Sequence, residues 1–428
     1  MTISPTAATE FQRRVLFAGA SGLFTDGYML GSISPALPGA IATLGLGPTG
    51  AGAVAAAPFL GLLLGSLFGG PVIDRYGRRL PFVWDMWLFL LFAIGHAFVH
   101  GAADLIILRF LTGLLLGVDY VAGKVYVSEC VANERRGALM SWLSVSWIAG
   151  YTAAFVAGSA LRDIFGADEW RLIFASASIP VLVAIAFRKN LPETAPWLAH
   201  HGRFEAALAV GKRCFGAHWT PSVASSSPTL RSSGWKALIR PPQHRVTFGV
   251  VAFYSLHNVP YLLLNTFLPG VLAGVGVRNP FTAGILYDAL IMAGALFGLK
   301  LIDVMGRRTL AIGSLCIQAA LLFGVIAFAA SPQITLILLA LFGAVLASAD
   351  SLTYAYPPEC FPTALRALGI GVTVAVSRAL ATVATFIFPK LVTGYGMQWV
   401  IGGLGVILAV GAAVCAATLQ ETRDAHIT

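Results

Sequence analysis

The chain contains 428 residues, of which 57% are hydrophobic and only 11% are charged, and its mean hydropathy is +0.80. This composition excludes a soluble globular domain of ordinary amino-acid usage and indicates a polytopic membrane protein. The formal net charge of +9 would suggest a nucleic-acid partner for a soluble protein. Here the basic residues fall mostly between apolar segments on one side, so we expect no nucleic acid.

Twelve apolar runs of about 20 residues follow one another, each long enough to cross roughly 30 Å of hydrocarbon as a helix. The first residues lack the features of a signal peptide, so we expect the N-terminus to stay in the cytosol. With both termini cytosolic, 21 of the 28 lysines and arginines fall in cytosolic segments, as the positive-inside rule requires. Arg188 is one of these 21 residues. The runs begin near Val15, Gly52, Leu80, Asp104, Ala138, Arg171, Val246, Phe281, Thr309, Ile334, Ala367 and Gly396. The seven exceptions are Arg109, Lys124, Arg162, Arg171, Arg278, Arg378 and Lys390.

The fourth run lies within the stretch from Arg109 to Gly137, where an apolar helix carries several charges. A charge at the bilayer centre costs roughly 2.5 to 3.5 kcal/mol on insertion scales, so Arg109, Asp119 and Lys124 must face partners or a water-filled cavity. A stripe of small residues on this helix would let a neighbouring helix approach closely. The alternative is a tightly packed structural helix with a snorkelling end. The stripe consists of Gly113, Gly117 and Gly123.

One long polar segment, Asn190 to Arg245, separates the sixth run from the seventh, and its middle has the Ser, Pro and Gly content of a flexible linker. We therefore predict a six-helix bundle in residues 1–189, a cytosolic linker in residues 190–245 and a second six-helix bundle in residues 246–428. The Ala-rich piece from His201 to Phe215 predicts a short amphipathic helix at the cytosolic surface, although a solvated helix is equally compatible with it.

The two halves repeat each other. The motif that starts at Asp74 (DRYGRR) returns 229 residues later at Asp303 (DVMGRR). The pair Glu129 and Cys130 returns 230 residues later, and the PET motif at Pro192 returns as QET 228 residues later. A transporter built from two similar bundles, with its site between them near the membrane midplane, is the architecture that such symmetry indicates.

These motifs resemble those of the major facilitator superfamily, and within it the sugar porters and the related metabolite:proton symporters and organic-ion transporters. The resemblance covers nearly the whole chain. It implies an all-α integral membrane protein with twelve transmembrane helices in two pseudo-symmetric six-helix bundles. It also implies a monomeric secondary transporter in the lipid of a bacterial cytoplasmic (inner) membrane, with no cofactor and no enzymatic activity. The matching residues are DRYGRR from Asp74, Arg109, Gly113, Gly117, Tyr126, Glu129, Arg136-Gly137, PETAPWL from Pro192, Gly202-Arg203, DVMGRR from Asp303, PECFPT from Pro358, Arg366 and Glu421-Thr422.

Departures from the sugar porters make a sugar substrate less favoured. Where sugar porters carry a glutamine pair on the seventh span, this chain has the segment from Ser255 to Tyr261, and Tyr354 stands where they place a tryptophan. The first-span segment from Phe24 to Gly31 (FTDGYMLG) instead resembles the Asp-Gly-Tyr signature of aromatic-acid and other organic-acid symporters.

The same resemblance assigns proton coupling to Asp26 and Arg109, which fall on the positions of the coupling pair in proton-coupled sugar porters. Paired with Arg109, the carboxylate of Asp26 would stay ionised, whereas burial without the pair would favour the protonated form. Movement between these environments would couple protons to transport. A permanent structural ion pair is the alternative.

Two cations on the spans, Lys124 and Arg378, could bind a substrate carboxylate, because a cavity with net positive potential concentrates anions. The alternative is that Lys124 neutralises Asp119 while Arg378 snorkels. Asp85 and His96 on the third span receive no assignment. Other polar or amphipathic groups on the spans are the sparse partners that an apolar pocket uses, although a single aromatic is more often packing. They are Tyr28, Asp119, Trp147, Tyr151, His257, Asn258, Tyr261, Asn265, Asp288 and Tyr354.

We expect a third set of charged residues to gather at the cytosolic ends of the helices as ion-pair clusters. In an outward-facing state these clusters would hold the halves together, so we interpret them as gate residues. The set consists of Asp74, Arg78, Arg79, Glu129, Arg136, Glu193, Asp303, Arg307, Arg308, Glu359, Arg366 and Glu421.

The sequence therefore predicts proton-coupled symport of a small organic acid or related metabolite by alternating access, with a monoanion as the favoured substrate. Proton-driven efflux of a drug or metabolite, and sugar:proton symport, are alternatives within the same fold. A receptor of this fold would be expected to lose Asp26 or gain long tails, and a membrane enzyme would need a catalytic motif that the sequence does not contain.

Overall fold

The computed structural model describes residues 5–130, 133–166, 169–215, 219, 235–241, 243–362 and 365–422. These residues form helices, turns and loops, with no strand among them. The helices are α1 (Pro5–Gly31), α2 (Ile33–Leu44), α3 (Pro48–Tyr76), α4 (Arg79–Gly95), η1 (His96–Phe98), α5 (Ala102–Cys130), α6 (Asn133–Phe165), α7 (Trp170–Ala175), α8 (Ser178–Arg188), α9 (Ala195–His200), α10 (Phe204–Phe215), η4 (Trp235–Ala237), α11 (Gln243–Thr266), α12 (Leu268–Gly274), α13 (Pro280–Val304), α14 (Arg307–Ala327), α15 (Pro332–Cys360), α16 (Arg366–Tyr395) and α17 (Met397–Thr418).

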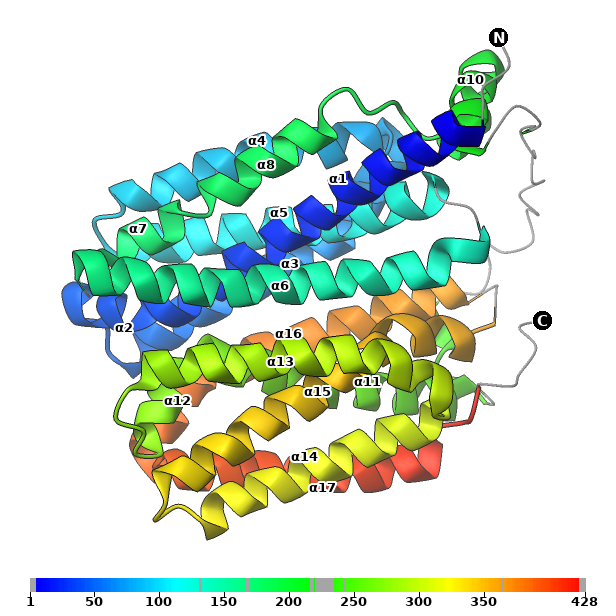
Figure 1. The fold of residues 1–428 in the computed structure, drawn as a ribbon. Helices are drawn as coiled ribbons and strands as arrows, with labels where there is room; N and C mark the ends of the chain where they lie inside the picture. The colour runs from blue at the N-terminus through cyan, green and yellow to red at the C-terminus, as the bar shows by residue number, and fades with distance from the viewer. Residues whose placement is uncertain are drawn as a thin grey trace.

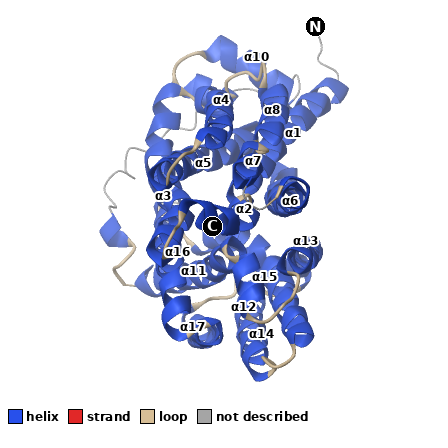
Figure 2. Cartoon of the chain, turned by 90° about the vertical axis from the view of Figure 1, so that its left-hand side faces the viewer, coloured by secondary structure: helices blue, strands red, loops and turns tan. Residues whose placement is uncertain are grey.

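The long helices lie side by side in two groups, with α1 to α8 in one and α11 to α17 in the other (Figure 1). Viewed along the helices, the two groups face each other across a plane that α3, α16, α6 and α13 border (Figure 2). We call them the N half and the C half. The all-α, two-bundle architecture predicted from the sequence is confirmed.

Eleven segments among the described residues are long and apolar enough to span a membrane. The remaining predicted span, α1, carries Glu10, Arg13, Arg14 and Asp26, which lower its hydropathy, but it packs along α6 as a full-length member of the N half. The sixth span consists of α7 and α8, joined at Ser176 and Ala177.

Small residues set the distance between α3 and α5. A Cβ atom added at Gly113 would lie 2.1 Å from the carbonyl oxygen of Pro58, and one at Gly117 would lie 2.5 Å from that of Leu62. Such contacts are far inside van der Waals separation, so only glycine allows this approach. The predicted stripe is confirmed at these two positions. At Gly123 the added atom would make only an ordinary contact with Phe82, at 3.4 Å.

The predicted surface helix is α10, which starts at Phe204 after Gly202 adopts a left-handed conformation at φ 73°. Its buried positions, Ala207, Gly211 and Cys214, recur at helical spacing. The side-chain amide of Gln12 on α1 donates a hydrogen bond of 2.7 Å to the carbonyl oxygen of Cys214. Packing against α1 therefore accounts for the amphipathic pattern.

Both GRR turns, at Gly77–Arg79 and Gly306–Arg308, lie at one end of the molecule, which we call the motif end. The opposite end is the far end. Close contacts between the halves occur toward the far end, where a Cβ atom at Gly52 of α3 would lie 2.2 Å from the carbonyl oxygen of Phe386 on α16. There the ring of Phe281 on α13 stacks on Phe155 of α6, with centroids 6.4 Å apart. The halves are thus closely packed toward the far end.

Candidate functional site

The motif end of the N half is held by a network around Arg78. Its guanidinium contacts Glu129 at 3.2 Å and Asp74 at 3.1 Å. The backbone N–H groups of Arg78 and Arg79 donate to the carboxylate of Glu193 at 3.0 to 3.2 Å. The PET segment is thereby fastened to the GRR turn, which begins the helix α4.

The C half repeats this network nearly atom for atom. Arg307 contacts Glu359 at 3.5 Å, and the backbone N–H groups of Arg307 and Arg308 donate to Glu421 at 2.7 and 3.2 Å. Thr422 donates to Glu359 at 2.5 Å, just as Thr194 donates to Glu129 at 2.5 Å in the N half.

A further pair of equivalent bonds ties each PET-type segment to its bundle. The hydroxyl of Tyr126 donates to the carbonyl oxygen of Pro192 at 2.6 Å, and that of Tyr356 donates to Gln420 at 2.7 Å. The structure therefore brings the predicted gate residues together, but each network lies within its own half. Their gating role stays a prediction, and the side chains of Arg136, Asp303 and Arg366 lie outside the described residues.

The predicted ion pair between Asp26 and Arg109 is not formed. Asp26 is 2% exposed and neither of its carboxylate oxygens has a hydrogen-bonding partner among the described residues. Arg109 donates instead to the carbonyl oxygen of Met29 at 2.9 Å and stacks over Phe174 at 5.1 Å.

Helix direction explains the separation of the two side chains. Side chains lean toward the N-terminus of their own helix. Since α1 begins at the motif end and α5 begins at the far end, Asp26 leans toward the motif end and Arg109 leans away from it. The charged groups around Asp26 include Asp119, Arg188 and Asp85, and Lys124 also interacts with it electrostatically.

The expected cytosolic position of Arg188 is wrong. Its side chain is 1% exposed at the end of α8 and lies inside the N half. Its guanidinium donates two hydrogen bonds to Asp119, at 2.7 and 2.9 Å, and one to Asp85 at 3.2 Å. It also donates to the carbonyl oxygen of Phe82 at 2.7 Å.

This acidic cluster, which comprises Asp26, Asp85, Asp119 and Arg188, corrects two interpretations. Asp119 is engaged by Arg188 and is not neutralised by Lys124. Because it binds Arg188, Asp119 is not one of the substrate contacts, contrary to the prediction. Asp85, which had no assignment, is a second partner of Arg188. With every group ionised the cluster would carry three negative charges against one positive charge, all in the interior of the N half.

Lys124 and Arg378 line one cavity of about 460 Å³ although they belong to different halves. The cavity lies among α3, α5 and α16, in the parts of these helices that are nearer the motif end. Arg378 is 7% exposed, so it does not snorkel. The ammonium group of Lys124 lies 3.5 Å from the ring centroid of Tyr120, and the remaining lining is mainly apolar.

Asp350, which is not among the residues predicted from the sequence, joins the halves beside these cations. Ser144 of α6 donates a hydrogen bond of 2.5 Å to one carboxylate oxygen of Asp350 on α15. The ring of His257 on α11 lies 3.5 Å from the other oxygen. Lys124 lies close enough to Arg378, Asp350 and Asp26 to interact with them electrostatically. Asp26 belongs to the acidic cluster, and we call Lys124, Arg378 and Asp350 the cationic site. Two cations and one anion give this site one net positive charge.

An aromatic group crosses the interface between the halves. The rings of Trp147 and Tyr151 on α6 lie 6.0 and 6.2 Å from that of Tyr261 on α11. The side-chain amides of Asn258 and Asn265 donate within α11, to Tyr254 and Tyr261. The side chain of Tyr354 lies outside the described residues.

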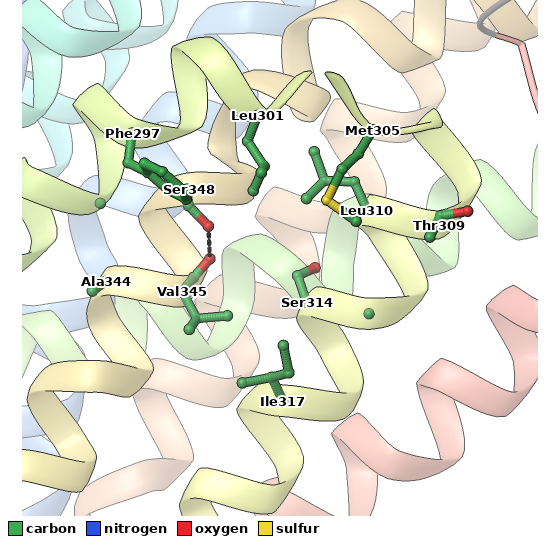
Figure 3. Close-up of a pocket in the computed structure, with 12 residues that line it drawn as sticks. Phe297, Leu301, Met305, Thr309, Leu310, Ser314, Ile317, Ala344, Val345 and Ser348 are labelled. Atoms are coloured by element: carbon green, nitrogen blue, oxygen red, sulfur yellow. Dashed lines mark hydrogen bonds between the residues drawn. The ribbon is translucent and has the colours of Figure 1, made fainter. Parts of the chain in front are cut away.

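Two other cavities have mainly apolar linings. A cavity of about 300 Å³ among α13, α14 and α15 is lined by residues such as Phe297, Leu301 and Met305 and contains no charged side chain (Figure 3). Of its hydroxyl groups, which belong to Thr309, Ser314 and Ser348, that of Ser348 donates to the carbonyl oxygen of Val345 on the same helix at 2.7 Å. Tyr28 lines a separate apolar groove and shares a hydrogen bond of 2.8 Å with Ser176, so it does not reach the cationic site.

Comparisons with known proteins agree with this architecture. A family model described as "Sugar (and other) transporter" matches residues 45–426. The inner membrane metabolite transport protein YgcS of Escherichia coli (strain K12) is 33% identical over 414 residues, which cover 97% of this chain and 92% of the relative. The cis,cis-muconate transport protein of Acinetobacter baylyi is 29% identical over 390 residues, which cover 89% and 88%.

Among solved structures, a partially occluded inward-open conformation of the xylose transporter XylE from E. coli superimposes with a TM-score of 0.80. The match covers 97% of this chain and 100% of that chain, at 18% sequence identity. At that identity the likeness establishes the fold.

Proposed function

Because the chain belongs to the sugar (and other) transporter family of the major facilitator superfamily, we propose that it carries a small organic monoanion across the membrane together with protons. The family and fold are those of transporters and not of enzymes, and the relative YgcS is an inner membrane protein. The observation that carries the proposal is the shared cavity of Lys124 and Arg378.

The charge of the cationic site favours one carboxylate. Lys124 and Arg378 supply two positive charges and Asp350 one negative charge, so a bound monoanion leaves the site neutral. A neutral sugar would add no negative charge beside the two cations, and the mainly apolar lining offers few hydroxyl partners. The cavity volume of about 460 Å³ lies in the range of small-molecule sites. A relative that carries cis,cis-muconate adds support for an organic acid.

The acidic cluster is our proposed coupling site. Arg188 engages Asp85 and Asp119, whereas Asp26 is buried beside them without a hydrogen-bonding partner among the described residues. An unpaired buried carboxylate is neutralised by taking up a proton. Asp26 is therefore the group that we propose to carry the coupling proton.

The packing of the halves indicates which end of the transporter is closed in this structure. They are close together toward the far end, and the cationic site lies nearer the motif end. We propose that the motif end faces the cytosol, as the distribution of basic residues predicts, and that the networks around Arg78 and Arg307 approach each other when that side closes.

The deciding experiment compares an acid with its neutral analogue. Purified protein is titrated with benzoate and with benzamide, and binding is followed by the rise in unfolding temperature. Two unit charges about 5 Å apart interact by about 3 kcal/mol at an effective dielectric constant of about 20. After solvent screening, Lys124→Ala or Arg378→Ala should weaken benzoate binding at least about tenfold.

The control is Lys390→Ala, which removes an exposed lysine of α16 outside the cavity and should leave benzoate binding unchanged. Benzamide binding should change little in all three variants. Equal losses for acid and amide, or tighter binding of xylose or an organic cation by the unmodified protein, would contradict an anionic substrate.

A further inference from the structure

Asp288 is a buried carboxylate that neither the cationic site nor the acidic cluster includes. It lies on α13 of the C half and is 1% exposed. Neither oxygen has a hydrogen-bonding partner, and no salt bridge reaches it, among the residues that the structure describes. An ionised carboxylate in such surroundings is strongly disfavoured unless something neutralises it.

The contacts of Phe281 and Gly284 show which helix the Asp288 face of α13 packs against. Phe281, Gly284 and Asp288 recur at helical spacing on one face of α13. Phe281 stacks on Phe155 of α6, and a Cβ atom at Gly284 would lie 2.3 Å from the same ring. Asp288 therefore faces α6 of the N half. On α6 the residue one turn from Phe155, toward the motif end, is Tyr151, and it lies close enough to interact electrostatically with Asp288.

The groups around Asp288 are hydroxyls. Tyr151 from α6, Tyr261 from α11 and Tyr287 from α13 interact with it electrostatically. Thr266 and Asn265 of α11 interact with the hydroxyls of Tyr151 and Tyr287, and Arg109 interacts with Tyr151. The guanidinium carbon of Arg162 on α6 lies 3.8 Å from the ring centroid of Phe281. Phe281 is two helical turns from Asp288 on α13, so Arg162 is not beside the carboxylate.

The helix α15 also packs against α13, and its Asp350 interacts with Tyr261, as Asp288 does. Ser144 and His257 already engage the carboxylate of Asp350. The surroundings of Asp288 therefore offer hydrogen-bond donors but no bound cation among the described residues.

We propose that Asp288 is a second proton-binding carboxyl of this transporter, located in the C half at the interface with α6. A proton neutralises the carboxylate in place, and the resulting carboxyl can exchange hydrogen bonds with the tyrosine hydroxyls around it. Each half then contributes one protonated carboxyl, Asp26 in the N half and Asp288 in the C half. The use of the second proton in transport rests on the proposed function, whereas the binding of the proton does not.

Infrared spectroscopy of the purified full-length protein in lipid tests the proposal without any substrate. A protonated carboxyl has a carbonyl stretching band that an ionised carboxylate and an amide lack. Asp288→Asn should remove one component of this band at neutral pH, and the double variant with Asp26→Asn should remove a further one. Asp288→Glu should restore a component at a shifted frequency. Asp163→Asn, at the exposed end of α6, is the matched control and should leave the band unchanged.

Two outcomes would overturn the assignment. An Asp288→Asn spectrum identical to that of the unmodified protein, from a sample that elutes as a folded species, would show that Asp288 carries no proton. A rise in unfolding temperature with sodium ions, present in the unmodified protein and lost in Asp288→Asn, would show a metal-cation site instead. A failure of benzoate to bind would change neither the infrared result nor the sodium result. The proposed function and the proton site at Asp288 can therefore fail separately.

Discussion

Replacement of Arg188 by methionine should destabilise the N half strongly. The guanidinium is 1% exposed and donates two hydrogen bonds to Asp119, one to Asp85 and one to the carbonyl oxygen of Phe82. Removal of one partner from a buried ion pair costs about 3 to 5 kcal/mol, because the remaining charge is left uncompensated. Methionine is apolar and similar in length, so the change removes the charge with little loss of volume.

The triple variant Arg188→Met, Asp85→Asn, Asp119→Asn isolates the electrostatic part. With the carboxylates replaced by amides, no buried charge is left without a partner, and replacing a whole buried pair by neutral groups is often nearly neutral. The triple variant should therefore recover most of the stability that the single variant loses. Arg203→Met removes an exposed arginine and should change stability by no more than about 0.5 kcal/mol.

The assay is reversible unfolding of purified protein in mixed micelles, followed by circular dichroism at several pH values. The deficit of Arg188→Met should shrink as the pH is lowered, because protonation removes the uncompensated carboxylate charge that the variant leaves in the cluster. An Arg188→Met protein as stable as the unmodified one, or a triple variant no more stable than the single, would refute the view that this cluster is held by charge neutralisation.

Three further changes test other parts of the structure. Asp26→Asn should abolish proton-driven accumulation of benzoate in proteoliposomes but leave counterflow exchange largely intact, and full accumulation would exclude the coupling role. Arg78→Ala should slow transport and bias the protein toward the state that is open at the motif end; unchanged labelling of an engineered cysteine in that cavity would contradict gating. Gly113→Ala places a Cβ atom 2.1 Å from the carbonyl oxygen of Pro58 and should reduce the unfolding temperature, whereas Gly394→Ala, with open space around it, should have little effect; equal effects would show that close approach of α3 and α5 is unimportant.

Local and repeated features could be predicted from the sequence. The network around Arg78 and its counterpart around Arg307 consist of residues in short motifs, and the repetition of those motifs indicates that each half builds the same contacts. The close approach at Gly113 and Gly117 follows from small residues at helical spacing. The glycine stripe is visible within the sequence of one helix. The motif networks join segments whose repetition in both halves indicates that they lie together.

Partners across helices could not be predicted in this way. Asp119 and Lys124 are neighbours in sequence, yet Asp119 binds Arg188, which comes from a different helix. Arg188 ends the last helix of the N half and precedes a polar segment, so its sequence context is that of a cytosolic residue. Only the packing of α8 against α1 and α4 shows that its side chain points inward.

Asp350 was missed for a different reason, since its signal was available. It is an aspartate within the apolar helix α15, and the cost of a buried charge that singled out Asp26 applies to it equally. The family motifs near it concern Tyr354 and Glu359 instead. The same criterion that favours Asp288 as a functional carboxylate on a span therefore applies to Asp350.

The helix α5 gives a physical reason why proton and anion binding can be coupled. Asp119 and Lys124 are five residues apart, so they point in directions about 140° apart around the helix and lie about 7.5 Å apart along it. Asp119 belongs to the acidic cluster inside the N half, and Lys124 lines the cavity shared with Arg378. A proton on Asp26 reduces the negative charge on one side of α5, and an anion reduces the positive charge on the other. Because the two sites have opposite charge and share one helix, each changes the electrostatic field at the other. Binding of both lowers the net charge of the acidic cluster from two negative charges to one and that of the cationic site from one positive charge to none, which reduces the cost of these charges in the membrane interior.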